Sequence, residues 1–195
     1  LFGAAGASAT AGVFTPMLPA LALATLLLAA VGVLATRSLR GLIAYLVVGS
    51  AGTLLLCIGL ATRQSVGAGL FYLVNSTLAA AVWFLIADRI AAARSSGDAL
   101  QRPAALAPRA WAPLGVAFFI AAVAAAGMPP LAGFFGKALL LQAAGQTPWA
   151  AWTVALVLGS SLAIVVALAR AGSSIFWKPG VATAATPSPH HALHT

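Results

Sequence analysis

GMPPLAGFFGKALLLQAA, residues 127–144, is the stretch that decides the fold, because two prolines and one lysine interrupt an apolar segment. The whole chain of 195 residues is 62% hydrophobic and only 6% charged, and its mean hydropathy is +1.05. Soluble domains average roughly 45–50% apolar and 25% charged residues. The composition therefore predicts an all-α integral membrane protein and excludes a soluble fold.

Apolar runs of about 20 residues are the length of a membrane-spanning helix. Five such runs predict five spans, at residues 18–36, 41–61, 67–87, 111–144 and 149–169. Residues 1–17 are expected outside the membrane, residues 88–110 as an extramembrane loop, and residues 171–195 as a polar, mobile tail. The first run follows Leu1 without a basic leader or a cleavage site, so we expect no signal peptide. We expect the chain to be the C-terminal fragment of a longer protein.

The fourth span is too long for one upright helix. Its 34 residues would cover roughly 50 Å at 1.5 Å per residue, against a hydrocarbon core of about 30 Å. Gly127, Pro129, Pro130 and Gly133 predict a break, because proline removes an amide donor and disfavours helical conformation at the preceding residue. Broken backbone inside a membrane is typical of ion paths in transporters. The alternative is a proline kink that only shapes packing.

The basic residues test whether residues 111–144 cross the membrane once or twice. A single broken crossing gathers eight of them on one side and leaves Arg63 alone on the other, whereas two crossings give six against three. The eight are Arg37, Arg40, Arg89, Arg94, Arg102, Arg109, Arg170 and Lys178. The positive-inside rule favours the single crossing, with residues 37–40, residues 88–110 and the tail in the cytoplasm. This distribution explains the net charge of +8 without nucleic-acid binding.

Lys137 lies within the broken span, with apolar residues on both sides. An ionisable group inside a membrane is costly and is a functional hypothesis by default. Lysine in a low dielectric can lose its proton, whereas arginine cannot. Lys137 is therefore the candidate proton-relay group. The alternative is a lysine that snorkels to the membrane surface.

Further polar residues for a relay follow a helical spacing. Tyr72, Asn75 and Ser76 share a face of the third span, and Ser50 begins a narrow polar stripe on the second. Such groups also hold helices together, which is the alternative for each.

No enzymatic motif occurs, and no cofactor is expected. The two acids, Asp88 and Asp98, both lie in the predicted loop, so no metal site is expected inside the membrane. The tail histidines His190, His191 and His194 are expected to be solvated.

Four stretches resemble the antiporter-like proton-translocating subunits. TRSLRGLIAYLVVGSAGTLLLCIGL (36–60), GLFYLVNSTLAAAVWFLIAD (69–88) and GMPPLAGFFGKALLLQA (127–143) are similar to helices of that family. ARAGSSIFWKP (169–179) is similar to the D subunit of the multisubunit monovalent cation/proton antiporters of the Mrp, Mnh and Pha type. Related subunits occur in respiratory complex I and in membrane-bound hydrogenases.

The resemblance implies two inverted repeats of five helices, with broken helices facing a hydrophilic axis. This chain would be the second repeat, and Lys137 the lysine of the axis. Family members often carry a histidine in the helix corresponding to 67–87, and some a lysine one turn later; this chain has Asn75 or Ser76 and Ala80 there. Hydroxyls, an amide and bound water would have to replace the histidine. The first repeat, with its paired glutamate and lysine, is outside this chain, so the fragment alone should not catalyse complete antiport.

The expected function is that of a proton-translocating subunit of a Na⁺ or K⁺/H⁺ antiporter in the bacterial inner membrane, a secondary transporter and not an enzyme. Its expected partners are the other antiporter subunits, protons, Na⁺ or K⁺ and the bilayer. One alternative is the same module in a redox-driven proton pump of the complex I or hydrogenase type. Another is a membrane scaffold that transports nothing.

Overall fold

The computed structural model describes residues 7–94, 100, 108–129 and 131–177. These residues form six α-helices followed by one π-helical turn, so the predicted all-α class is confirmed. The elements are α1 (Ala7–Ala35), α2 (Leu39–Gly59), α3 (Arg63–Ala93), α4 (Pro108–Ala126), α5 (Ala132–Ala144), α6 (Ala150–Gly172) and η1 (Ser173–Trp177).

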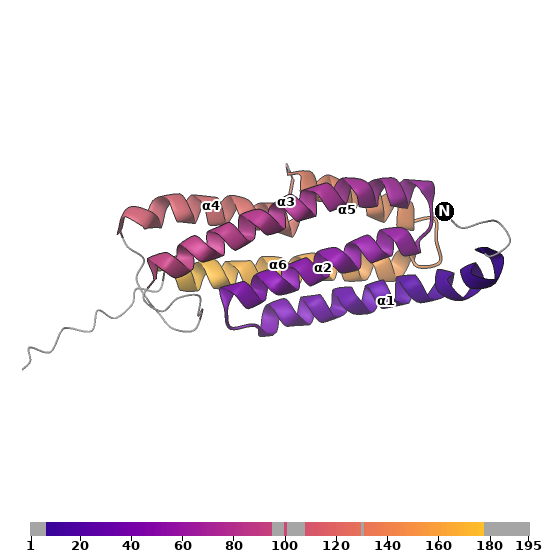
Figure 1. Cartoon of the computed structure of the whole chain (residues 1–195), viewed down its shortest axis with the longest axis horizontal. Helices are drawn as coiled ribbons and strands as arrows, with labels where there is room; N and C mark the ends of the chain where they lie inside the picture. Colours follow the sequence, from indigo (N-terminus) through magenta and orange to yellow (C-terminus); the bar gives the residue numbers. More distant parts are fainter. Residues whose placement is uncertain (1–6, 95–99, 101–107, 130, 178–195) are drawn as a thin grey trace, which may run out of the picture.

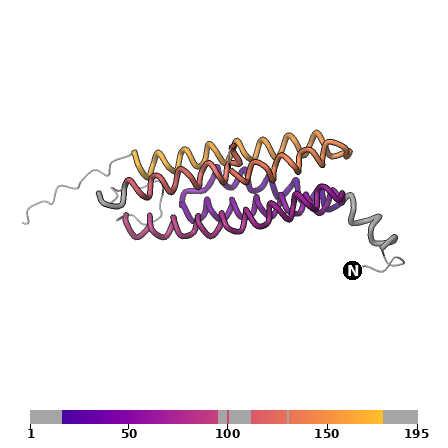
Figure 2. Tube along the Cα trace, turned by 90° about the horizontal axis from the view of Figure 1, so that it is seen from above, coloured from indigo at the N-terminus to yellow at the C-terminus, as the bar shows by residue number. Residues whose placement is uncertain are grey.

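The helices form an elongated bundle in which successive crossings run in opposite directions (Figure 1). Helices α4 and α5 lie roughly in line and cross the bundle once between them, as predicted for the broken span (Figure 1). Figure 2 shows this pair running alongside α6, which contacts both helices. In the described part of the chain, four helical segments are long and apolar enough to cross a membrane, and the apolar stretches Ala112–Ala126 and Ala132–Ala144 are shorter. The chain is therefore a multi-pass membrane protein.

Most described basic residues lie at one end of this bundle. The single crossing by α4 and α5 brings the end of α1, the start of α2 and the ends of α3 and α6 together (Figure 1). Arg63 opens α3 at the opposite end. The uneven distribution of basic residues between the two ends, from which a single crossing was predicted, is thus present in the fold.

The helices that follow the two short connections, α2 and α3, begin with capped first turns. Ser38 Oγ accepts a hydrogen bond from the Gly41 amide at the start of α2. Thr62 and Ser65 bond each other's backbone amides at the start of α3 and form a capping box. These caps satisfy amides that the first helical turn leaves without a partner, so short turns suffice between α1, α2 and α3.

The helices extend past several predicted boundaries. Helix α3 continues through residues 88–93, which were expected to begin the loop, and Ile90 is fully buried there. Asp88 also pairs with Arg40 of α2, with 3.3 Å between Nη2 and Oδ1. Burial of Ile90 thus continues the helix where the charged residues suggested a loop. Residues 171–177, assigned to the tail, are helical as well, whereas residues 178–195 lie outside the described part of the chain.

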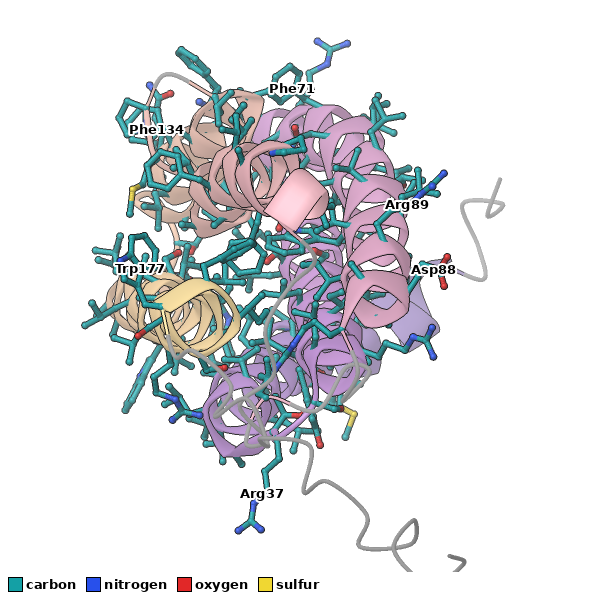
Figure 3. All side chains as sticks on the ribbon, turned by 90° about the vertical axis from the view of Figure 1, so that its left-hand side faces the viewer. Arg37, Phe71, Asp88, Arg89, Phe134 and Trp177 are labelled. Atoms are coloured by element: carbon teal, nitrogen blue, oxygen red, sulfur yellow. The ribbon has the colours of Figure 1, made fainter. Side chains whose placement is uncertain are left out.

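Two apolar clusters fill the interior at different levels. One packs Val33, Leu42, Trp83, Phe118 and Leu168, among others, near the end where α2 begins. The other packs residues of α1, α2, α5 and α6 near the opposite end, including Leu26, Leu56, Cys57, Leu140 and Val157. Seen along the bundle, Phe71, Phe134 and Trp177 point outward, as do Arg37 and Arg89 (Figure 3). The outward aromatic residues suit a lipid-facing surface.

Candidate functional site

The break between α4 and α5 is made first by a glycine. Gly127 has φ +73°, a left-handed conformation that favours glycine. Its amide donates to the Ala124 carbonyl at 3.1 Å, and the Met128 amide donates to the Val123 carbonyl at 3.2 Å. This pair of bonds is a Schellman motif, the usual glycine-dependent end of a helix. Pro129 follows directly, where a proline prevents the helix from resuming. Pro130 lies outside the described residues.

The side chain of Lys137, on α5, reaches the C-terminal end of α4. The Schellman bonds use the carbonyls of Val123 and Ala124, and the Ala126 carbonyl accepts from Lys137 Nζ at 3.1 Å. Lys137 Nζ also donates to Ser161 Oγ on α6 at 2.9 Å. A positive charge is favourable at a helix C-terminus, where the backbone dipoles leave partial negative charge. Nζ therefore has two oxygen partners within the bundle, contributed by α4 and α6.

Two glycines let α5 approach its neighbours closely. A Cβ at Gly133 would lie 2.7 Å from the Ala124 carbonyl oxygen and 3.4 Å from Asn75 Nδ2. A Cβ at Gly136 would lie 3.0 Å from the ring of Tyr72. The small residues thus place α5 against both the end of α4 and the polar face of α3. Gly133, predicted as part of the break, lies inside α5 and serves this close packing.

A cavity of about 50 Å³ lies next to Lys137, and its wall includes residues of all six helices. Its wall includes members of both apolar clusters. The five predicted relay residues all line it: Ser50, Tyr72, Asn75, Ser76 and Lys137. A water molecule needs about 10–15 Å³ by this measure and two to four polar partners, so the cavity has room for about three. The structure thus brings the predicted residues around one small, partly polar space.

The hydroxyls of this wall are satisfied mainly by their own helices. Ser50 Oγ donates to the Leu46 carbonyl at 3.1 Å, and Ser76 Oγ donates to the Leu73 carbonyl at 3.1 Å. Tyr72 donates to Ser50 Oγ over 3.5 Å, the one hydrogen bond between two predicted relay side chains that the described part of the chain contains. A continuous relay among these residues would therefore need intervening water.

Sequence reasoning missed several polar members of the site, and one of them, Tyr45, lines the cavity from α2. Ser161 contacts Lys137 directly, Ser160 lines the cavity, and so does Trp83, whose Nε1 is buried with no hydrogen-bond partner among the described residues. The paired serines in VLGSSLAI (157–164) interrupt the apolar run of the fifth predicted span. That pair was the available signal, although spacing alone does not say which serine faces α5.

Within the described residues, no three His, Cys, Asp or Glu side chains come together as a metal site. Asp98 and the tail histidines lie outside those residues. The cavity wall offers one amine, several hydroxyls and an amide. These groups suit proton exchange with water, because each can donate or accept a hydrogen bond and the amine can also change its charge.

Comparison with known proteins places the chain in a family. Residues 7–163 match the family model described as NADH:quinone oxidoreductase/Mrp antiporter, TM. The chain is 32% identical over 204 residues to a protein of Rhizobium meliloti (strain 1021) named as the D subunit of a probable K⁺/H⁺ antiporter, covering 91% of this chain and 38% of that relative. It is 38% identical over 154 residues to NADH-quinone oxidoreductase subunit N 2 of Acidobacterium capsulatum, covering 78% of this chain and 30% of that one.

A solved structure gives the same result for the fold. The chain superimposes on part of the Mrp complex from Dietzia sp. DQ12-45-1b with a TM-score of 0.75 and 27% identity, covering 84% of this chain and 30% of that chain. The chain thus spans a third or so of the length of the relatives it matches. With its broken helix, its partly buried lysine and the match over residues 7–163, the chain belongs to the NADH:quinone oxidoreductase/Mrp antiporter membrane family.

Proposed function

We propose that this chain is the proton-translocating part of the D subunit of a multisubunit monovalent cation/proton antiporter, with Lys137 as its protonatable group. The relatives named as D subunits of K⁺/H⁺ and Na⁺/H⁺ antiporters, the second of them from Bacillus subtilis (strain 168) at 29% identity, support this assignment. Its partners would be the other antiporter subunits, protons and Na⁺ or K⁺. It would act as a secondary transporter in the bacterial inner membrane, with the arginine-rich end of the bundle in the cytoplasm.

The observation that carries the proposal is the position of Lys137 Nζ. The amine donates hydrogen bonds to the Ala126 carbonyl at the C-terminal end of α4 and to the hydroxyl of Ser161. The residue also lines the cavity. In each turnover, a proton would pass from cavity water to the amine. It would then pass from the amine to water that is open to the other side of the membrane. Ser50, Tyr72, Asn75 and Ser76 would hold that water, because their side chains line the same cavity. Gly127, Pro129 and Pro130 would keep the helix open at this level, and Gly133 would hold α5 against the end of α4.

The test uses the full-length subunit in its complex, in everted vesicles with a pH-sensitive dye. Exchange on addition of Na⁺ or K⁺ is compared for wild type, Lys137→Ala and Lys137→Arg. We expect both variants to lose exchange while the complex still assembles, because arginine retains the charge but does not release its proton.

Thr77→Ala is the matched control for this test. Thr77 lies on α3 near the polar face, but it is exposed and donates only to its own helix, at the Leu73 carbonyl. This variant should retain wild-type exchange. Undiminished exchange in Lys137→Ala and Lys137→Arg would mean that Lys137 is an anchor, as in the snorkelling or scaffold alternatives, and would remove the proposed relay.

The similarity to NADH-quinone oxidoreductase subunit N 2 favours a second candidate, a redox-driven proton pump. The two functions differ in what drives the proton. Antiport stops when Na⁺ and K⁺ are withheld and does not depend on NADH or ferredoxin. A pump moves protons on addition of reductant in the absence of both cations, so the same vesicles distinguish the two.

A further inference from the structure

Ser161 differs from the other hydroxyls of the site because it contacts the amine itself. It lies on α6, 24 residues after Lys137, and its Oγ accepts from Lys137 Nζ at 2.9 Å. The same oxygen donates to the Val157 carbonyl, one helical turn earlier, at 2.7 Å. Ser160 also donates to the Val157 carbonyl, at 3.0 Å, without bonding Lys137 in the described structure. The two adjacent serines therefore have different surroundings.

The hydrogen bonds of Ser161 determine what it offers to Lys137. A serine hydroxyl has one hydrogen to donate and two lone pairs. The hydrogen is used on the Val157 carbonyl, so only a lone pair faces Nζ. The second partner of Nζ, the Ala126 carbonyl, is also an acceptor only. Both partners of the amine accept hydrogen bonds from its N–H groups, and neither is a base that would take up its proton.

These two contacts leave one position on the amine. A tetrahedral nitrogen has four positions, of which one holds the side-chain carbon and two point to Ala126 and Ser161. Lys137 lines the cavity, whereas Ala126 and Ser161 do not, so cavity water would reach the amine at this last position. An ammonium would place its third hydrogen there, and a neutral amine could keep both donated bonds with its lone pair in the same direction.

We propose that Ser161 is a positioning residue that holds Lys137 Nζ with its one exchangeable position toward the cavity, so that the amine exchanges protons only with cavity water. This inference rests on the proposed relay function of Lys137 and assigns to α6 a part in it. The hydroxyl acts through Lys137 and carries no proton of its own across the membrane, because it keeps its hydrogen and donates it to the Val157 carbonyl in a hydrogen bond.

The test compares substitutions at position 161 that differ in the hydroxyl, in the full-length subunit within its complex. Ser161→Ala removes the hydroxyl. Ser161→Thr and Ser161→Val have nearly the same shape as each other, and only threonine retains the hydroxyl. We expect exchange in everted vesicles to fall about tenfold in the alanine and valine variants, as for loss of one hydrogen bond to a charged group. Threonine should restore most of it.

The pH profile of exchange separates positioning from packing. Loss of one of two acceptors disfavours the ammonium, so the profile of Ser161→Ala should move to lower pH by about one unit. Tyr45 and Tyr72 are the other titratable groups that line the cavity, from α2 and α3, and the substitution leaves both in place. A packing defect alone would lower the rate without moving the profile.

The controls make the outcomes distinct. Thr77→Ala, another hydroxyl bonded to its own helix, should leave rate and profile unchanged. Wild-type rates and profiles in both Ser161→Ala and Ser161→Val would overturn the positioning role, even if Lys137 proves essential. Full exchange in the Lys137 variants would instead overturn the relay on which the inference depends. If alanine assembles poorly, the threonine and valine pair decides.

Discussion

Helix α3 and the α4–α5 pair both cross the bundle and both carry polar groups at its middle level, but only one of them is broken. Ser76 and Thr77 sit in an unbroken α3 because each hydroxyl donates to the Leu73 carbonyl of its own helix. Lys137 brings an ammonium with three hydrogens to donate and no lone pair, so it needs several acceptors. The end of α4 supplies one at Ala126. Short polar side chains are thus satisfied within their own helix, whereas the partly buried amine finds its acceptors on other helices, one of them at the break.

The largest effect on stability and exchange should come from Gly127→Ala, which changes the residue that ends α4. Alanine in the left-handed conformation costs about 1–2 kcal/mol, and its Cβ would lie 3.0 Å from Lys137 Nζ. Crowding of the packed core adds about 1 kcal/mol. We expect a lower denaturation midpoint of the purified complex in detergent and loss of exchange in vesicles. Gly67→Ala on α3 is the control, because no atom lies within 4 Å of its added Cβ.

Gly133→Ala should follow, since it tests the contact between the two halves of the broken crossing. The added Cβ would be 2.7 Å from the Ala124 carbonyl oxygen, which is backbone and cannot rotate away. Overpacking of this type costs about 1–3 kcal/mol. The denaturation midpoint should fall, and Gly159→Ala on α6, which meets no atom within 4 Å, should not lower it. Equal midpoints for both variants would show that α5 can move away from α4 at no cost.

Thr62→Ala tests how the unbroken helix begins. It removes one side of the capping box with Ser65, which should cost about 1 kcal/mol of stability. Because Thr62 is far along α3 from the cavity residues, exchange by the assembled complex should be unchanged at low temperature. A lower midpoint with normal exchange would separate stability of α3 from the chemistry of the site. Loss of exchange at a normal midpoint would contradict that separation.

Ser76→Ala should have the smallest effect on stability, within about 0.5 kcal/mol, because it removes a bond that the helix makes to itself. Its effect on exchange is the informative quantity. A slower exchange than in Thr77→Ala would support a role for the Ser76 hydroxyl in holding cavity water. Identical rates in the two variants would assign Ser76 to packing.

The sequence was sufficient for the crossing pattern because apolar length and arginine positions are properties of the chain itself. The break was predicted at the right place, but from the prolines, whereas the helix already ends at Gly127 through a Schellman motif. The loop after α3 was predicted to start at Asp88, because charge there masks the burial of Ile90. Ser161 was missed because its importance depends on where α6 meets α5, which no spacing within the fifth predicted span reveals.

The break also bears on how the protein enters the membrane. Helix α4 has 19 residues and α5 has 13, which makes them about 28 Å and about 20 Å long at 1.5 Å per residue. Helix α5 alone cannot cross a hydrocarbon core of about 30 Å, so it completes a crossing only together with α4. Lys137 adds an insertion cost of about 2.5–3.5 kcal/mol if it lies near the midplane. One of its two partners, Ala126, belongs to that same crossing, whereas Ser161 is synthesised later. The second hydrogen bond of Lys137 can therefore form only after α6 has been synthesised and has packed against α5.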